Sequence, residues 1–172
     1  MRRKITAERS ENMSKLIVET EGSAPESVKS LIRLAAKAAF AHFEYDWDGY
    51  VFIQLVDGET IRQINKEHRG IDKETDVLSF PMNDFYRGEC REEIYTDPQL
   101  GACELGDMVI SLSRAREQAR EFGHSVAREC AYLTVHSILH LLGFDHIDEG
   151  EEKAAMRQKE EEILKKLGLE RE

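Results

Sequence analysis

The sequence predicts a single domain that combines helices and strands, because the chain suits one core and its apolar residues follow two periodicities. It has 172 residues, 41% of them hydrophobic, which is enough for one compact domain and short for two. Runs of β-branched and aromatic residues, typical of strands, alternate with segments whose apolar residues recur at helical spacing. Residues 13–172 are expected to form this domain, and the polar, aperiodic residues 1–12 a mobile N-terminal extension.

The first half of the chain predicts two strands, each followed by a helix. Residues 15–20 (KLIVET) are apolar and β-branched, which is typical of a strand. Ser23 and Glu26 have the spacing of a capping box, and apolar residues recur at helical spacing after them. Residues 50–56 (YVFIQLV) predict a buried strand, and a weaker helix is expected to end at Arg69.

The middle of the chain predicts two further strands separated by a long connection. Residues 75–80 (TDVLSF) are typical of a strand that stops at a proline. Residues 82–101 are rich in charged and turn-forming residues and predict a long surface loop, a kind of segment that is often functional. Residues 106–112 (GDMVISL) predict a strand, and residues 113–122 a helix with exposed arginines.

Two helices are expected in the last third of the chain. Ser125 is a candidate N-cap for a helix that runs to Leu142 and is apolar on nearly every face, so this helix is expected in the core. From Asp148 onward the chain is acidic, with apolar residues at intervals that suit an amphipathic C-terminal helix. Its run of charges is expected to be a solvated face.

Charge and cysteine content exclude several classes of protein. Lys and Arg total 24 against 34 Asp and Glu, a formal charge of −10, which argues against coating nucleic acid through bulk electrostatics. Cys90, Cys103 and Cys130 form no CxxC pair and no disulfide-dense pattern, so a reducing cytoplasm is expected. No apolar run approaches the roughly 18 residues of a membrane helix, and no signal peptide is recognisable.

The strongest functional signal is a cluster of three histidines, His136, His140 and His146, in the segment HSILHLLGFDH. Positions four apart lie on one face of a helix, so the first two imidazoles can reach a common point. Gly143 can adopt the left-handed conformation that ends a helix, which lets the chain turn back and present the third histidine.

Three protein ligands leave one tetrahedral position for water, which is the arrangement of catalytic zinc, and such water has a pKa of about 7. The alternative is that the three are core histidines bonded to backbone carbonyls, which three histidines at this spacing disfavour. Asp145 is a candidate to hold one imidazole in the correct tautomer, and the alternative is an ordinary acidic loop residue.

The spacing His-x3-His-x2-Gly-x2-His resembles the signature of metzincin peptidases. In that signature the residue after the first histidine is the catalytic glutamate, and here it is Ser137. A serine cannot act as the carboxylate base, so the peptidase interpretation loses its central chemical group.

Read in full, HSILHLLGFDH is similar to the signature of the YbeY family, bacterial metal-dependent endoribonucleases that act in ribosomal RNA maturation and ribosome quality control. Arg69-Gly70 with residues 75–81 (TDVLSFP), and residues 105–111 (LGDMVIS), resemble two further blocks of this family. The resemblance spans about residues 15–169. One departure is Ser137, where many members have glycine, and its side chain can crowd a substrate near the metal.

The resemblance implies an α+β fold, in which a small mixed β-sheet is flanked by helices and a zincin-like or metzincin-like helix carries the metal. It implies one Zn2+ per chain held by His136, His140 and His146, and a functional Arg69, so these four are the expected catalytic residues. The implied activity is single-strand-specific RNA cleavage in 16S rRNA 3′ end maturation. The implied partners are ribosomal RNA, the small ribosomal subunit and assembly factors, with no DNA and no membrane.

Arg69 suits this chemistry because a guanidinium presents a bidentate fork to phosphate and can stabilise a phosphoryl transition state. Without the resemblance, it would be interpreted as a surface arginine after a helix. In the apolar block that follows, Thr75 and Ser79 are candidate hydroxyls lining the cleft.

A basic run follows in the second half of this acidic chain: Arg114, Arg116, Arg120, His124 and Arg128. It can guide a phosphate backbone toward the metal, but a solvated helix face is the favoured interpretation.

Two other functions remain open from the sequence. A metallopeptidase is favoured by the histidine spacing and opposed by Ser137. A non-catalytic ribosome assembly factor with a structural zinc is compatible with the ribosomal setting that the resemblance implies.

Overall fold

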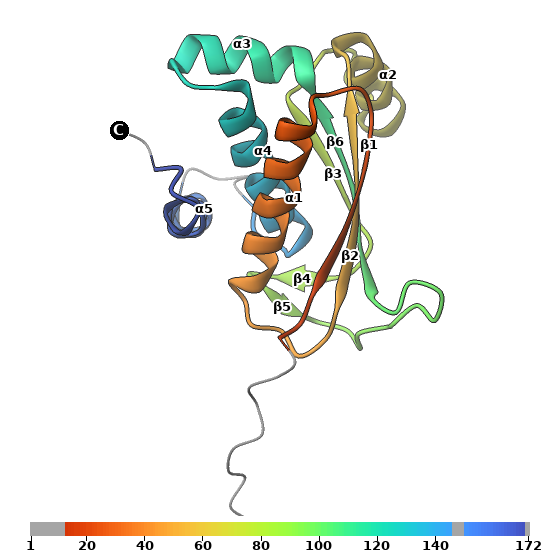
Figure 1. Ribbon diagram of the computed structural model, residues 1–172. Coiled ribbons are helices and arrows are strands. Elements are labelled where there is room, and N and C mark those ends of the chain that lie inside the picture. The colour runs from red at the N-terminus through yellow and green to blue at the C-terminus, as the bar shows by residue number, and fades with distance from the viewer. Residues whose placement is uncertain (1–12, 146–149, 171–172) are drawn as a thin grey trace, which may run out of the picture.

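The computed structural model describes residues 13–145 and 150–170, so the predicted extension at residues 1–12 lies outside the described residues. Strands and helices alternate in the first part of the chain, and a group of strands and then a group of helices follow (Figure 1). The strands are β1 (Leu16–Glu21), β2 (Gly49–Val56), β3 (Val77–Pro81), β4 (Phe85–Tyr86), β5 (Glu89–Cys90) and β6 (Cys103–Ser111). The helices are α1 (Glu26–Ala41), α2 (Gly58–Arg69), α3 (Leu112–Phe122), α4 (Val126–Leu141) and α5 (Glu151–Lys166).

Four strands form one mixed sheet in the order β1-β2-β6-β3. Strands β1, β2 and β6 are parallel, and α1 makes the crossover between the first two, as parallel strands require. Strand β3 pairs with β6 in the antiparallel sense and lies at one edge. The mixed sheet flanked by helices confirms the predicted α+β class.

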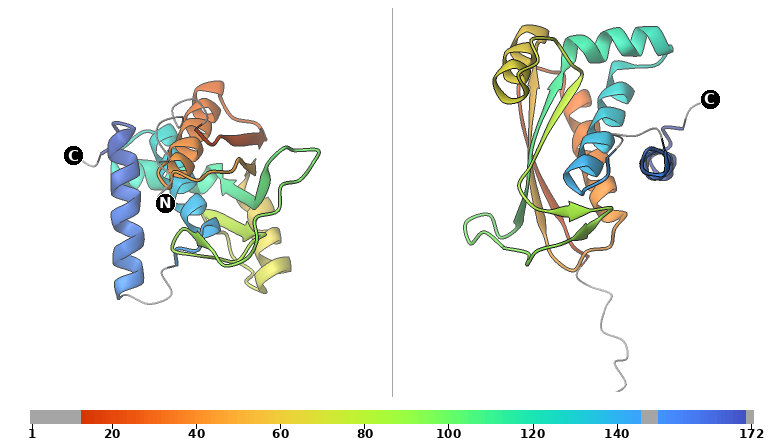
Figure 2. Two further views of the ribbon diagram at one scale, coloured as in Figure 1. Left: turned by 90° about the horizontal axis from the view of Figure 1, so that it is seen from below. Right: turned by 180° about the vertical axis from the view of Figure 1, so that it is seen from behind.

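Helices α1 and α4 lie side by side over one face of the sheet, and α2 covers the other face at one end (Figures 1 and 2). The alternation of side chains along β6 explains this division, since successive residues point to opposite faces. Met108 and Ile110 belong to the main core with α1 and α4, whereas Val109 packs with Ile61 of α2. The sheet is therefore buried on both sides where α2 lies.

Helix α4 is central to the core, as the sequence predicts. Ser125 caps it by accepting a hydrogen bond from the Arg128 amide at 3.1 Å. Ten of its residues are buried, on all sides of the helix, because α1, α3, α5 and the sheet surround it: Glu129, Cys130, Ala131, Leu133, Thr134, Val135, Ser137, Ile138, Leu139 and Leu141. The buried side chains of this helix are accordingly held in fixed positions.

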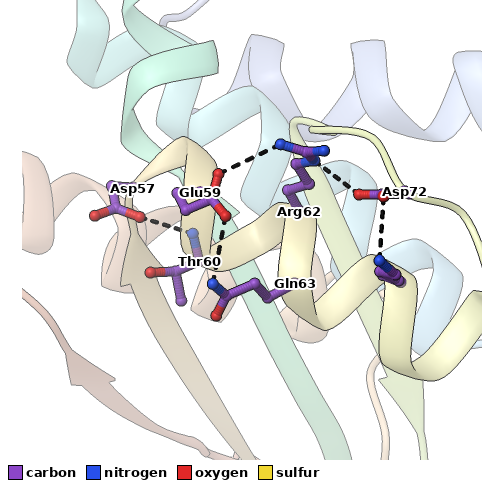
Figure 3. Close-up of polar contacts among 7 residues, drawn as sticks. Asp57, Glu59, Thr60, Arg62, Gln63 and Asp72 are labelled. Atoms are coloured by element: carbon purple, nitrogen blue, oxygen red, sulfur yellow. Dashed lines mark hydrogen bonds and ion pairs between the residues drawn. The ribbon is translucent and has the colours of Figure 1, made fainter.

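Helix α2 and the loop after Arg69 are joined by a polar network (Figure 3). Asp57 caps the helix by accepting from the Thr60 amide at 2.8 Å. Asp72 in the loop accepts hydrogen bonds from Arg62 Nε at 2.7 Å and Lys66 Nζ at 3.2 Å, and these bonds hold the pKa of Asp72 below its ordinary value. The loop thus stays close to the last turns of α2.

Two local predictions are wrong. Helix α1 has Pro25 at its N-cap and no side-chain cap, because Glu26, the expected capping partner of Ser23, pairs with Arg33 instead. Residues 82–101 are not a plain surface loop, since they contain the β4–β5 hairpin, whose Phe85 is buried in the main core.

Among the described residues, no helix is long and apolar enough to cross a membrane.

Candidate metal centre

His136 and His140 lie on the same face of α4, one turn apart. Their Nε2 atoms are 3.0 Å apart, and their rings meet edge to face. Two imidazole nitrogens at this distance either share a proton or bind one cation. Nitrogens bound to one tetrahedral zinc lie about 3.3 Å apart, so a small opening of this pair accommodates the ion.

The carboxylate of Glu160, on α5, contacts one histidine of this pair. Its Oε1 accepts a hydrogen bond from Nδ1 of His136, and the Tyr132 hydroxyl lies 3.5 Å from its other oxygen. A proton fixed on Nδ1 leaves the lone pair of Nε2 directed toward His140, where a metal is expected. A carboxylate, a histidine and a metal in this order are the usual arrangement of a zinc ligand with its supporting acid.

Glu160 is not recognised from the sequence, which predicts a solvated face for the charges of the C-terminal segment. The residue is only 6% exposed, so that interpretation is wrong at this position. A signal was present, because Met156, Glu160, Ile163 and Leu167 recur at the spacing of one helical face. A carboxylate on the apolar face of a helix is expected to have a buried partner, either a hydrogen-bond donor or a positively charged group.

Gly143 makes the turn after α4. Its φ is +82°, as the sequence predicts, and its amide donates to the His140 carbonyl at 3.0 Å. A Cβ at this position would lie 2.2 Å from the Phe85 carbonyl oxygen, so the backbone of the hairpin also requires glycine. The hairpin approaches closely because the amides of Arg87 and Gly88 donate to the carbonyls of Gly143 and Leu142, at 3.1 and 2.8 Å.

The third expected ligand, His146, lies outside the described residues. Asp145, the candidate partner of an imidazole, is half-buried directly before them. Within residues 13–145 and 150–170, no group of three His, Cys, Asp or Glu side chains is placed to hold a metal ion. The described part of the site therefore consists of two imidazoles and their supporting carboxylate.

Ser137 and Ser79 connect α4 to the edge strand of the sheet. Their hydroxyl oxygens are 2.5 Å apart, and Ser137 is fully buried, so its side chain points toward β3. Thr75 is half-buried, and its hydroxyl lies 3.4 Å from Asp76 Oδ1. Roles of Ser137, Ser79 and Thr75 near a substrate stay predictions.

Arg69 is exposed at the end of α2 and donates to Asn65 Oδ1 at 3.5 Å. Helix α2 packs on the opposite face of the sheet from α4, and within the described residues no hydrogen bond joins Arg69 to the histidines. The side chain of Asn65 is itself fixed, because it donates to the Lys73 carbonyl at 2.9 Å. The guanidinium is therefore available to a ligand, and its role beside the histidines stays a prediction.

Comparisons with known proteins identify the family of this chain. A family model described as Endoribonuclease YbeY matches residues 15–168. The chain belongs to the YbeY family. The curated relative named Endoribonuclease YbeY from Caldicellulosiruptor saccharolyticus is 49% identical over 146 residues, which cover 85% of this chain and 90% of that protein. The one from Clostridium botulinum (strain Loch Maree / Type A3) is 46% identical over 151 residues, 84% of this chain and 88% of that protein.

Among solved structures, TM1509 from Thermotoga maritima matches this YbeY family member with a TM-score of 0.55 and 22% identity, covering 89% of this chain and 91% of that one. This likeness supports the fold. The predictions of YbeY family membership and of an RNA-cleaving hydrolase class are confirmed by the family match, which favours neither the metallopeptidase nor the non-catalytic factor.

In this YbeY family member the basic run does not form a continuous free cationic surface. Arg114 pairs with Glu117. Arg128 donates to the carbonyls of Leu169 at 3.0 Å and Glu170 at 2.7 Å, and also contacts His124 Nδ1. These contacts attach the end of the chain to the start of α4, so they support a structural role for Arg128.

Replacing Glu160 with glutamine is expected to weaken zinc binding about 10- to 100-fold, the usual effect of removing such a supporting carboxylate. The amide keeps the volume but presents no charge to His136 Nδ1. Zinc affinity is measured by competition with a chromophoric chelator. The control is Glu161→Gln, an exposed neighbour on α5. Equal zinc affinities in the two variants would show that Glu160 does not support the metal site.

Proposed function

We propose that this chain is a zinc-dependent endoribonuclease specific for single strands, with one zinc bound by His136, His140 and His146. The observation that carries the proposal is the pair of Nε2 atoms 3.0 Å apart, supported by the buried Glu160 carboxylate. The name Endoribonuclease, shared by the relatives, supports RNA as the substrate.

The residues of this chain have separate tasks in the proposed reaction. His136 and His140 hold the ion, and Glu160 keeps the proton on the Nδ1 of His136, so Nε2 stays available for coordination. Zinc, when bound, supplies a Lewis acid that polarises phosphoryl oxygens and lowers the pKa of a coordinated water. Arg69 binds a phosphate and stabilises the charge that develops on it.

We place the reaction in 16S rRNA 3′ end maturation and ribosome quality control, with ribosomal RNA, the small ribosomal subunit and assembly factors as partners. The net charge of −10 supports local recognition of RNA, because a protein of this charge does not attract nucleic acid over its whole surface. Cys90, Cys103 and Cys130 are free thiols, which supports the cytoplasm as the compartment.

The test combines metal analysis with cleavage assays on the purified full chain. About one zinc per chain is expected, together with cleavage of a single-stranded RNA that stops on chelation and returns on addition of zinc. An RNA duplex and an unstructured polypeptide serve as alternative substrates. Preferential cleavage of the duplex or of the polypeptide would contradict the proposal.

Replacing Arg69 with alanine is expected to reduce RNA cleavage roughly 100-fold and leave the zinc content unchanged, because a phosphate-binding group is lost while the metal ligands stay. Both quantities are measured on the same preparation. Arg120→Ala, which removes an exposed arginine of α3, is the control and should retain full activity. Full cleavage by a folded Arg69→Ala protein would contradict this role.

A further inference from the structure

The β4–β5 hairpin presents a tyrosine that contacts two arginines. Tyr86 is 42% exposed. The Cζ of Arg91 lies 4.5 Å from the centroid of the Tyr86 ring, and the Cζ of Arg87 lies 5.5 Å from it. Both arginines are exposed as well. We call Tyr86, Arg87 and Arg91 the hairpin cluster.

The two guanidiniums of the hairpin cluster are not neutralised. Arg33, Arg62 and Arg114 each pair with a glutamate or aspartate, whereas within the described part of the chain no carboxylate lies within ion-pair distance of Arg87 or Arg91. Two exposed arginines without an ion-pair partner are available to contact an anion.

The hairpin cluster is fixed beside the turn that follows His140. The amides of Arg87 and Gly88 bond to the carbonyls of Gly143 and Leu142, and the Tyr45 hydroxyl donates to the Gly88 carbonyl at 2.6 Å. Burial raises the pKa of Tyr45 above its ordinary value, which further favours the protonated hydroxyl that donates this bond. Gly143 is the third residue after His140, so the two Cα atoms are at most about 11 Å apart.

The backbone of Arg87 is held in an uncommon conformation. Its φ is +48°, in the left-handed region that few residues with a side chain adopt, and the two hydrogen bonds to the turn keep it there. Beneath the cluster, the Phe85 ring contacts Tyr45 and Trp47 in the core. An exposed aromatic and two cations are thus carried on a rigid support.

We propose that the hairpin cluster binds one nucleotide of a single-stranded RNA next to the metal centre, by stacking of its base on the arginine and tyrosine planes and by contact of a guanidinium with phosphate. This inference rests on the proposed function. Bases stack on aromatic rings and on guanidinium planes, and every base has a face to offer, so the contact requires no particular sequence. A duplex keeps its bases stacked internally, so the cluster selects single strands.

The test measures binding of a short fluorescein-labelled single-stranded RNA to the zinc-loaded full chain, with the same strand annealed to its complement as a second probe. Tyr86→Ala and Arg91→Gln are each expected to weaken single-strand binding roughly 10-fold and to leave the zinc content unchanged. Tyr86→Ala is also expected to leave duplex binding unchanged. Tyr86→Phe retains the ring and is expected to bind like the wild type. Tyr95→Ala removes a tyrosine that is 68% exposed on the same segment, and is the matched control.

The outcomes separate this inference from the proposed function. Weaker single-strand binding in Tyr86→Ala and Arg91→Gln, with Tyr95→Ala unaffected, supports the hairpin cluster whether or not the wild type cleaves the probe. Unchanged binding in both variants, with cleavage by the wild type, contradicts the cluster and leaves the proposed function intact. An equal loss of single-strand binding in Tyr95→Ala would also contradict the inference, because the loss would then not be specific to the hairpin cluster.

Discussion

Replacing His140 with alanine is expected to abolish zinc binding and RNA cleavage together. The substitution removes the nitrogen that faces His136 Nε2 at 3.0 Å, so a direct ligand is lost. The loss of affinity should exceed the roughly 10- to 100-fold expected for a supporting residue such as Glu160. Zinc per chain and cleavage of single-stranded RNA are measured on one preparation.

The control for this variant is His68→Ala, which removes an exposed histidine that contacts Phe80 on the other face of the sheet. It is expected to keep both zinc and activity. Full RNA cleavage by a folded His140→Ala protein would contradict a catalytic metal. A variant that no longer cleaves RNA but still supports ribosome maturation would favour the non-catalytic assembly factor.

Replacing Gly143 with alanine is expected to lower the free energy of unfolding by about 3 kcal/mol. The left-handed conformation costs a residue with a Cβ roughly 1–2 kcal/mol, and contact with the Phe85 carbonyl adds about 1–3 kcal/mol, since backbone atoms cannot move aside easily. The melting temperature should fall by roughly 6–12 °C. Denaturation is followed with a chelator present, so that a change in zinc affinity does not contribute.

Gly123→Ala is the matched control for Gly143→Ala. Gly123 has a φ of +72° at the end of α3, and no atom lies within 4 Å of an added Cβ. This variant therefore carries the conformational cost alone, roughly 1–2 kcal/mol. An equal decrease in the free energy of unfolding of the two variants would show that the hairpin backbone moves to accommodate the added methyl group.

Most of the fold follows from periodicity in the sequence. Helix α4 is recognisable because Ser125 caps it and its faces are uniformly apolar, and the long strands are recognisable from β-branched runs. The β4–β5 hairpin is not, because strands of two residues are too short to show alternation. Its structure depends on hydrogen bonds to Leu142 and Gly143, which lie far away in the sequence.

The candidate site was predictable only where the chemistry is local in sequence. His136 and His140 are four residues apart on one helix, so their meeting follows from helical geometry. Glu160 comes from another helix, and the many neighbouring charges hide the one carboxylate that lies on the apolar face. Arg69 was selected by resemblance, and the structure places it on a helix that packs on the opposite side of the sheet.

The contact between Glu160 and His136 has a thermodynamic consequence for the C-terminal helix. Glu160 on α5 contacts His136 on α4, so under the proposed function the free energy of metal binding and the free energy of docking α5 are linked. Each process favours the other to the same extent, as linkage requires. A ligand or partner that displaces α5 would accordingly weaken binding of this metal, and loss of the metal would weaken the docking of the helix.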